Sequence, residues 1–462
     1  MFICVFLQSI YMDSMVSDIP LWKVAANSCR EILDILRDDI GSKDLLSLSR
    51  STPNYGLMNA LESLIELCCG CPSEVNAILL EQVLSVCAMA STFAAPVVNA
   101  SSPEGFLPDS DDAVELMKNV NLDGTRPTSE STDAAQLLLV MCWRMTKSVS
   151  MLMGTICSVF NAGVEIYKKC GQYFLDQLTH GRHRGAFELA ATGFTNLCKD
   201  ARCHNSSEIS NLPEEWLRLT IDILSDEEKC KSLCNTRRSA GLPFLFTALC
   251  CSDVGQRGKP LLHQSMGVLF PLAKQVDNPD LSCHARNILR ALFRESSLSE
   301  DVLRYAEDAL MYSISGFADK SWALRNTSAM LYSTLCSRIF GVKKSDHEEK
   351  ISNSEFFSRF SNLEKFLLDN LETGSSFITK NKLHPTLLPS LLIIQRLYPT
   401  GTSNNEARFI DSLFRCAASR GKLNVKGTLF PRAHNLTANS NQCSNYISNV
   451  FLIDPHFYLK FN

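Results

Sequence analysis

The sequence lacks the short motifs that mark the common families of enzymes. It contains no G-x-G-x-x-G or P-loop segment for nucleotides, no H-E-x-x-H pair for zinc and no G-x-S-x-G turn for a serine nucleophile. Alternating β-branched runs are also missing, so no βαβ unit is present to hold a dinucleotide. These absences argue against a catalytic chain, and we expect no catalytic residues, no metal ion and no cofactor.

Aromatic residues and net positive charge are also scarce. Aromatic residues make up 8% of the chain and fall mostly in apolar stripes, which gives no evident stacking platform for single-stranded nucleic acid. Charged residues make up 20%, and the formal net charge is −4. Any contact with nucleic acid would therefore depend on local basic clusters.

Cysteine is abundant, but its spacing does not indicate a metal site or a disulfide framework. Of the 19 cysteines, only Cys68 and Cys71 form a C-x-x-C pair, and no second pair follows at a zinc-ligand distance. Most others fall among apolar residues, as reduced thiols do in cytosolic proteins. Residues 1–11 are apolar but too short to span a bilayer, and no other uncharged stretch reaches the ~18 residues needed. We expect a cytoplasmic protein without a membrane span.

A helical period runs through nearly every segment. In 134–160, apolar residues recur at alternating steps of four and three: Leu138, Cys142, Met145, Val149, Leu152 and Ile156. A second stripe comprises Phe187, Ala190, Ala191, Phe194, Leu197 and Cys198. The chain is therefore predicted to be all-α.

A slower repeat overlies the helical period. Arginines followed by small residues and aliphatics occur at Arg184, Arg238, Arg286 and Arg325, at spacings of 54, 48 and 39 residues. These spacings bracket the ~40–47 residues of HEAT and armadillo units. Such helix pairs bury their apolar faces only by stacking, so we predict a HEAT/armadillo-like solenoid. Asp319 and Arg325 resemble the pair that commonly ties adjacent HEAT repeats together.

Four regions follow from these patterns. Residues 1–98 are predicted to form N-terminal helical repeats, and 99–133 an acidic flexible insertion. Residues 134–420 form the predicted central helical-repeat domain. The Asn- and Ser-rich residues 421–462 have no sustained period and are predicted to be a disordered tail.

Two basic segments stand directly before predicted helices. Arg182, His183 and Arg184 precede the run 186–198, and Arg237 and Arg238 precede a run that begins near residue 240. The first turn of a helix carries partial positive charge, so cations are unfavourable there unless an anion is close. We interpret the two segments as a surface for phosphate or carboxylate. The alternative is that each arginine pairs with a neighbouring acidic side chain.

Several segments, in order, resemble the thyroid adenoma-associated protein family, which includes the yeast partner of a tRNA ribose methyltransferase. They are Ser102-Pro-Glu-Gly-Phe-Leu-Pro, Cys142-Trp-Arg-Met-Thr-Lys-Ser-Val-Ser-Met-Leu-Met-Gly, His183-Arg-Gly-Ala-Phe-Glu-Leu-Ala, Thr236-Arg-Arg-Ser-Ala-Gly-Leu-Pro-Phe, His284-Ala-Arg-Asn-Ile-Leu-Arg-Ala-Leu-Phe-Arg, Trp322-Ala-Leu-Arg-Asn-Thr-Ser, and Ile339-Phe-Gly-Val-Lys followed by Glu355-Phe-Phe-Ser-Arg-Phe. Together they cover roughly residues 100–420. The R-R-S-A-G-[IL]-P string is specific to this family.

The resemblance implies a non-catalytic helical scaffold that binds an FtsJ-type methyltransferase. That enzyme uses S-adenosylmethionine to methylate a ribose 2′-OH in the tRNA anticodon loop, and the scaffold has no cofactor site of its own. The family string is associated with methylation activity, so the resemblance implies a role in tRNA or partner binding for Arg237, Arg238, Ser239, Ala240, Gly241, Leu242 and Pro243. From charge alone, we add Arg182, His183, Arg184, Arg144 and Lys147 to this predicted site.

A protein of another class would explain the same arginines. In that alternative, the solenoid is a protein–protein scaffold whose arginines hold repeats together or bind acidic peptide, without touching RNA. A third alternative, an enzyme built on His183 and Cys198, is weaker because a solenoid seldom encloses such a pair in a dry pocket.

Overall fold

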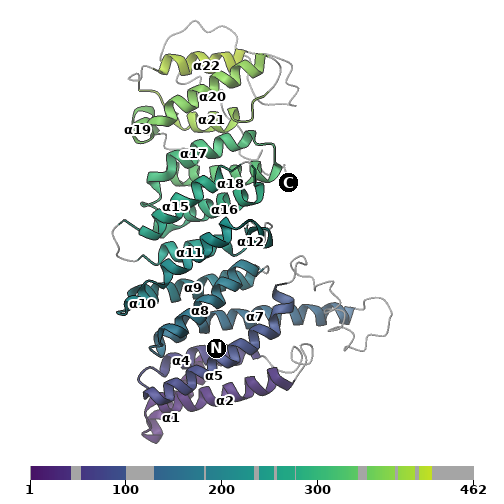
Figure 1. Cartoon of the computed structure of the whole chain (residues 1–462), viewed down its shortest axis with the longest axis vertical. Helices are drawn as coiled ribbons and strands as arrows, with labels where there is room; N and C mark the ends of the chain where they lie inside the picture. Colours follow the sequence, from purple (N-terminus) through teal and green to yellow (C-terminus); the bar gives the residue numbers. More distant parts are fainter. Residues whose placement is uncertain are drawn as a thin grey trace. The chain divides into compact units, whose positions relative to one another are not determined.

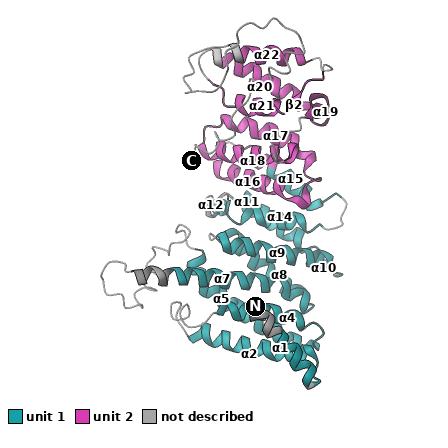
Figure 2. Ribbon diagram, turned by 180° about the vertical axis from the view of Figure 1, so that it is seen from behind, with its two compact units in different colours: residues 1–269 teal, residues 270–462 magenta. Residues whose placement is uncertain are grey.

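The structure is a computed structural model, and it describes residues 2–42, 54–99, 129–181, 184–233, 239–253, 258–275, 277–341, 351–379, 383–400 and 405–418. Contacts between Cα atoms divide the chain into two units, residues 1–269 and 270–462 (Figure 2). The boundary falls inside one helix, α15 (Pro260–Ala273).

Unit 1 is built from helices that pack against their near neighbours in sequence (Figure 1). In order these are α1 (Phe2–Ser17), α2 (Leu21–Ser42), α4 (Asn54–Leu67), α5 (Ser73–Val98), α7 (Ser129–Val159), α8 (Val164–His180), α9 (Arg184–Cys203), α10 (Ser207–Ser210), α11 (Leu212–Ser225), α12 (Glu227–Ser232), α14 (Leu242–Cys251) and most of α15. The most extensive packing joins α7 to α9, and α7 also contacts α4 and α5.

The predicted apolar stripes form the core of unit 1. All six stripe residues of α7 and all six of α9 are buried. Gly154 and Gly193 let these two helices approach closely, because a Cβ at Gly154 would come within 2.6 Å of the Gly193 carbonyl oxygen. A Cβ at Gly193 would overlap the carbonyl oxygen of Ser150. The helical period therefore selects the buried face, and the glycines set the helix separation.

Unit 2 continues with helices and one very short sheet. Its elements are α16 (Pro279–Arg294), η1 (Ser296–Leu298), η2 (Leu303–Tyr305), α17 (Ala306–Ser315), η3 (Gly316–Ala318), α18 (Trp322–Phe340), β1 (Ile351–Ser352), α19 (Asn353–Arg359), α20 (Ser361–Thr379), α21 (Leu387–Ile394), β2 (Leu397–Tyr398) and α22 (Glu406–Ala418). The two strands pair in parallel, with Ile351 opposite Leu397. The all-α prediction is confirmed, with this pair as a small addition.

The start of α16 follows a sequence rule. The Asn278 side chain accepts a hydrogen bond from the backbone N–H of Leu281 at 3.1 Å, and Pro279 occupies the first helical position. An asparagine N-cap satisfies an otherwise unpaired N–H group, and proline fits the first turn because its missing N–H would have no partner there. This start positions the arginine of α16 described below.

The four predicted regions stay predictions. Residues 100–128 of the expected insertion and the whole of 419–462 lie outside the described residues. Helix α7 begins at Ser129, inside the range given to the insertion. The boundary between the two units falls within the predicted 134–420 domain.

Among the described residues, two helices are long and apolar enough to cross a membrane by length and composition, although the sequence indicated no span. They are α5 and residues 136–159 of α7. Both also bury residues in unit 1, including Leu79 and Val83 of α5 and Cys142 and Val149 of α7. Core helices of helical proteins satisfy the same criterion, so it is weak evidence for a span.

Candidate functional site

The two helices that follow the basic segments begin side by side. The centre of the Phe187 ring lies 5.6 Å from the centre of the Phe244 ring. Phe187 is in the first turn of α9, and Phe244 is in the first turn of α14. Phe187 is buried and Phe244 is 39% exposed. Residues 182–183 and 234–238 lead directly into these helices in sequence but lie outside the described residues, and so do Arg182, His183, Arg237 and Arg238. The structure thus brings together the starts of the two helices on which the predicted site depends.

Arg184 is the one residue of the first basic segment that the structure describes. Its side chain is exposed, and its Nε atom donates to Glu188 Oε1 at 2.8 Å, one turn along α9. This is the pairing with a neighbouring acidic side chain that the alternative interpretation expects. An exposed pair of this kind contributes only about 0.3–0.5 kcal/mol, so an anionic ligand could compete with Glu188.

The described part of the family string, Ser239–Pro243, is buried. Ser239 and Ala240 have left-handed backbone angles, φ 68° and 47°, and each is 3% exposed. Gly241 follows against the backbone of α8, where a Cβ would come within 2.5 Å of the Leu178 carbonyl oxygen. Non-glycine residues in this conformation cost of order 1–3 kcal/mol each, so the packing of α14 on α8 holds them there. Ser239–Pro243 thus fix the start of α14 by packing. The binding role predicted for these residues stays a prediction.

Arg144 and Lys147 lie on the side of α7 that faces α4. The Arg144 guanidinium carbon lies 4.5 Å from the centre of the Tyr55 ring, a cation–π geometry. Burial and the nearby Glu66 raise the pKa of the Glu62 carboxyl, and Lys147 partly opposes this shift. Both basic side chains are half-buried. Trp143, the neighbour of Arg144, lies against Gly185 at the start of α9. This patch therefore adjoins α9, but its charges are partly engaged within unit 1.

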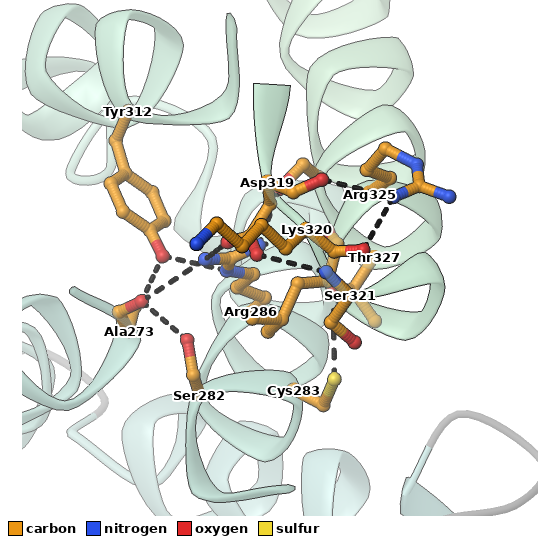
Figure 3. A network of polar contacts seen from close by, with 12 residues as sticks. Ala273, Ser282, Cys283, Arg286, Tyr312, Asp319, Lys320, Ser321, Arg325 and Thr327 are labelled. Carbon is orange, nitrogen blue, oxygen red and sulfur yellow. Dashed lines mark hydrogen bonds and ion pairs between the residues drawn. The ribbon is translucent and has the colours of Figure 1, made fainter. Parts of the chain in front are cut away.

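The arginine of α16 is buried in unit 2 and fully engaged (Figure 3). Arg286 is 4% exposed and donates to the Leu324 carbonyl oxygen at 2.8 Å and to Ser328 Oγ at 2.7 Å. Its Nη2 atom lies 3.6 Å from Asp319 Oδ2. The Tyr312 hydroxyl accepts from its Nε atom at 2.6 Å. Arg286 therefore joins α16, α17 and α18 and has no surface to offer to a ligand.

The expected tie between Asp319 and Arg325 takes a different form. The Asp319 carboxylate pairs with Arg286 of the preceding helix pair. Arg325 instead donates from Nη1 to the backbone oxygens of Asp319 and Lys320, at 2.9 and 2.8 Å. The sequence indicated the right aspartate but the wrong arginine, because spacing along the chain does not show which helix faces it.

Most cysteines of the described residues occupy core positions, as predicted, whereas Cys69 and Cys203 are exposed and Cys251 and Cys336 are half-buried. Burial raises the pKa of the Cys142 and Cys250 thiols to about 12, and that of Cys198 well above its usual value. Within the described ranges, no group of three or more Cys, His, Asp or Glu side chains is arranged to hold a metal ion. The enzyme alternative receives no support from Cys198, because a buried protonated thiol is a poor nucleophile.

Sequence reasoning missed two exposed aromatic residues. Phe244 directly follows the family string, and Trp322, the first residue of α18, is 70% exposed. Their place in the first turn of a helix was the available signal, since a side chain there lies near a helix end that neighbouring helices often leave uncovered.

Comparison with known proteins gives two family matches and several relatives. A family model described as THADA/TRM732, DUF2428 matches residues 78–323, and one described as Trm732, C-terminal TPR repeats matches residues 325–422. The tRNA (32-2'-O)-methyltransferase regulator THADA of Homo sapiens is 33% identical, over 84% of this chain and 24% of its own length. The regulator trm732 of Schizosaccharomyces pombe is 32% identical, over 69% of this chain and 22% of its own. No solved structure matches this chain.

The helical packing and the repeat-family match define the class of this chain: an α-helical repeat protein. The chain belongs to the THADA/TRM732 family, which confirms the resemblance drawn from the sequence. It spans about a quarter of the length of the curated relatives that it matches.

Proposed function

We propose that this chain acts as a non-catalytic scaffold for ribose 2′-O-methylation at nucleotide 32 of tRNA. It would dock an FtsJ-type methyltransferase and help to bind and position the anticodon loop, while the enzyme binds S-adenosylmethionine. The proposal is supported by family membership, since relatives across animals and yeast are named as regulators of this methyltransferase. It is also supported by the contact between Phe187 and Phe244, because this contact places the starts of α9 and α14 together.

Phosphate contact is the chemistry that this site suits. Backbone contacts by arginine and lysine orient a nucleic acid without reading its sequence. Such a scaffold would hold the loop while a separate enzyme selects and methylates the ribose. The buried Ser239–Gly241 turn, which directly follows Arg237 and Arg238 in the sequence, is packed on α8.

The test is methylation in a reconstituted reaction that contains this chain, its cognate methyltransferase, tRNA and S-adenosylmethionine. We expect the double variant Arg237→Ala, Arg238→Ala to fold normally and to lose methylation at nucleotide 32. The matched control replaces two exposed arginines elsewhere, Arg218→Ala and Arg294→Ala, and should retain activity. Full methylation by the Arg237, Arg238 variant would overturn the role proposed for this string.

A protein–protein scaffold without RNA contact is the second candidate. The pairing of Arg184 with Glu188 and the burial of Arg286 favour it, because both arginines are engaged within their own unit. The two candidates differ in how the affinity of the chain for tRNA responds to salt.

A further inference from the structure

The start of α18 carries an exposed aromatic side chain that packing does not explain. At 70% exposure, Trp322 is far more accessible than the next most exposed aromatic side chain of the described ranges, Tyr11 at 48%. By contrast, Trp216 is 3% exposed and lies in the core of unit 1. The Trp322 indole has no hydrogen-bond or ring partner within the part of the chain that the structure describes. Large aromatic side chains that are exposed to solvent are enriched at binding sites, where they supply a flat apolar face to the ligand.

The three residues before Trp322, Asp319–Ser321, are held firmly by hydrogen bonds (Figure 3). Asp319 Oδ1 accepts from the Ser321 N–H at 3.2 Å, and the same carboxylate pairs with Arg286. Arg325 Nη1 bonds to the carbonyl oxygens of Asp319 and Lys320. The loop before Trp322 is therefore fixed from both sides. Binding of a ligand to the indole would therefore cost little conformational entropy in this loop.

The surroundings of Trp322 are cationic. Lys320, two residues earlier, is exposed, and Arg325 lies less than one turn later on α18. Arg325 uses only Nη1 for the carbonyl oxygens, so Nε and Nη2 remain available for a ligand among the described residues. The charge of Asp319 is opposed by Arg286. A ligand at this position would therefore encounter one aromatic face and two cations.

We propose that Trp322, Lys320 and Arg325 form a platform for one unpaired RNA nucleotide. The base stacks on the indole, and the phosphates on its two sides are bound by Lys320 and Arg325, whose side chains extend to opposite sides of the loop (Figure 3). Stacking on aromatic residues combined with a basic track is the general mode of binding single-stranded RNA. This inference deepens the proposed function, on which it rests for the choice of RNA.

RNA fits this platform better than a protein partner does. Protein hot spots place tryptophan at the centre of an apolar patch from which water is excluded. Here the nearest exposed residues in sequence are Lys320 and Ala323, and no other large apolar side chain of the described residues between Phe244 and Leu383 is exposed. One flat apolar face beside cations matches a base and the phosphates on its two sides.

The test measures binding of a fluorescently labelled RNA hairpin to the full chain without methyltransferase. We expect Trp322→Ala to weaken binding of a hairpin with an unpaired loop about tenfold, and Trp322→Phe to retain most of the affinity. Binding of a fully paired duplex of the same length should change little. The control is Phe414→Ala, which removes an exposed aromatic residue of α22 and should leave both affinities unchanged. Unchanged melting temperatures would show that the variants are folded.

Three results would overturn the platform. They are an unchanged hairpin affinity for Trp322→Ala, an equal loss on hairpin and duplex, or no measurable hairpin binding by the unmodified chain. If the first of these results came with loss of methyltransferase co-purification, Trp322 would be assigned to a protein contact. The proposed function is judged separately, by methylation with the Arg237, Arg238 variant, so failure of one is distinguishable from failure of the other.

Discussion

At the scale of single residues, glycine and arginine carry much of the organisation of this chain. Gly193 lets α9 meet the backbone of α7, and Gly241 lets α14 meet the backbone of α8. Inside unit 2, carbonyl, hydroxyl and carboxylate groups take the place of water as the partners of the Arg286 guanidinium. In each case the residue type is required by what lies within 4 Å of it.

Gly193→Ala should destabilise unit 1 by about 1–3 kcal/mol, the usual range for a group forced into a packed site. The new methyl group would overlap the Ser150 carbonyl oxygen, which belongs to the backbone and cannot rotate away. Urea unfolding followed by circular dichroism would measure the change. The control is Gly267→Ala in α15, where a Cβ meets nothing within 4 Å. That change should stabilise the chain by about 0.4–1 kcal/mol, through the reduced entropy of the unfolded state. Equal effects of the two substitutions would contradict this account.

At the scale of elements, α16 is unusual because it is buried on almost every side. Residues 281–289 are all buried, including His284 at 0% exposure. Neither ring nitrogen of His284 has a hydrogen-bond partner among the described residues. Burial lowers the pKa of His284 to about 4, and the nearby Asp280 carboxylate opposes this shift only in part. The ring is therefore neutral in the folded chain at any pH above that value.

A neutral buried histidine makes stability depend on pH. Between its usual pKa of 6.5 and its folded pKa of about 4, the unfolded chain binds more protons than the folded chain, so stability falls as the pH falls. From pH 7.5 to pH 5 we expect the contribution of His284 to drop by about 2 kcal/mol. His284→Leu should remove this part of the loss. Unfolding of both proteins in urea at the two pH values would measure it, and an identical pH dependence would refute the assignment.

The elements also show the limits of sequence reasoning. Helical period correctly selects the buried stripes of α7 and α9, because a repeat of 3.6 residues fixes which side chains share a face. The helical period does not show which neighbours the side chains outside the stripe contact. Arg144 reaches the Tyr55 ring of α4 and is not simply solvated. The exposure of Trp322 likewise depends on which neighbouring helix ends cover the first turn of α18. Such contacts depend on tertiary packing, which sequence spacing does not encode.

At the scale of the whole molecule, the net charge of −4 decides what kind of RNA binding is reasonable. Long-range attraction between the entire chain and an anionic RNA is absent, so affinity must arise from local contacts such as Lys320 and Arg325. We expect the logarithm of the tRNA binding constant to fall linearly with the logarithm of salt concentration. The slope should be about −0.7 to −0.9 for each phosphate contacted.

Measurement of this slope with and without methyltransferase separates the two candidate functions. A negative slope for the chain alone supports direct phosphate contact. A flat response in both cases would favour the protein–protein scaffold and contradict the prediction. Electrophoretic mobility shifts over a series of potassium chloride concentrations are sufficient.

The Arg286 network has a consequence for how this family is divided into parts. The border between the two matched family models falls at residues 323–325, inside the first turn of α18. Arg286 lies on one side of that border, its acceptor Leu324 lies between the two matches, and its acceptor Ser328 lies on the other side. Cutting the chain there would remove two acceptors of the Arg286 guanidinium, the Leu324 carbonyl oxygen and Ser328 Oγ, and separate α16 from the helix that covers it. Residues 273–328 should therefore be kept as one indivisible block in any truncation, whatever boundaries sequence profiles suggest.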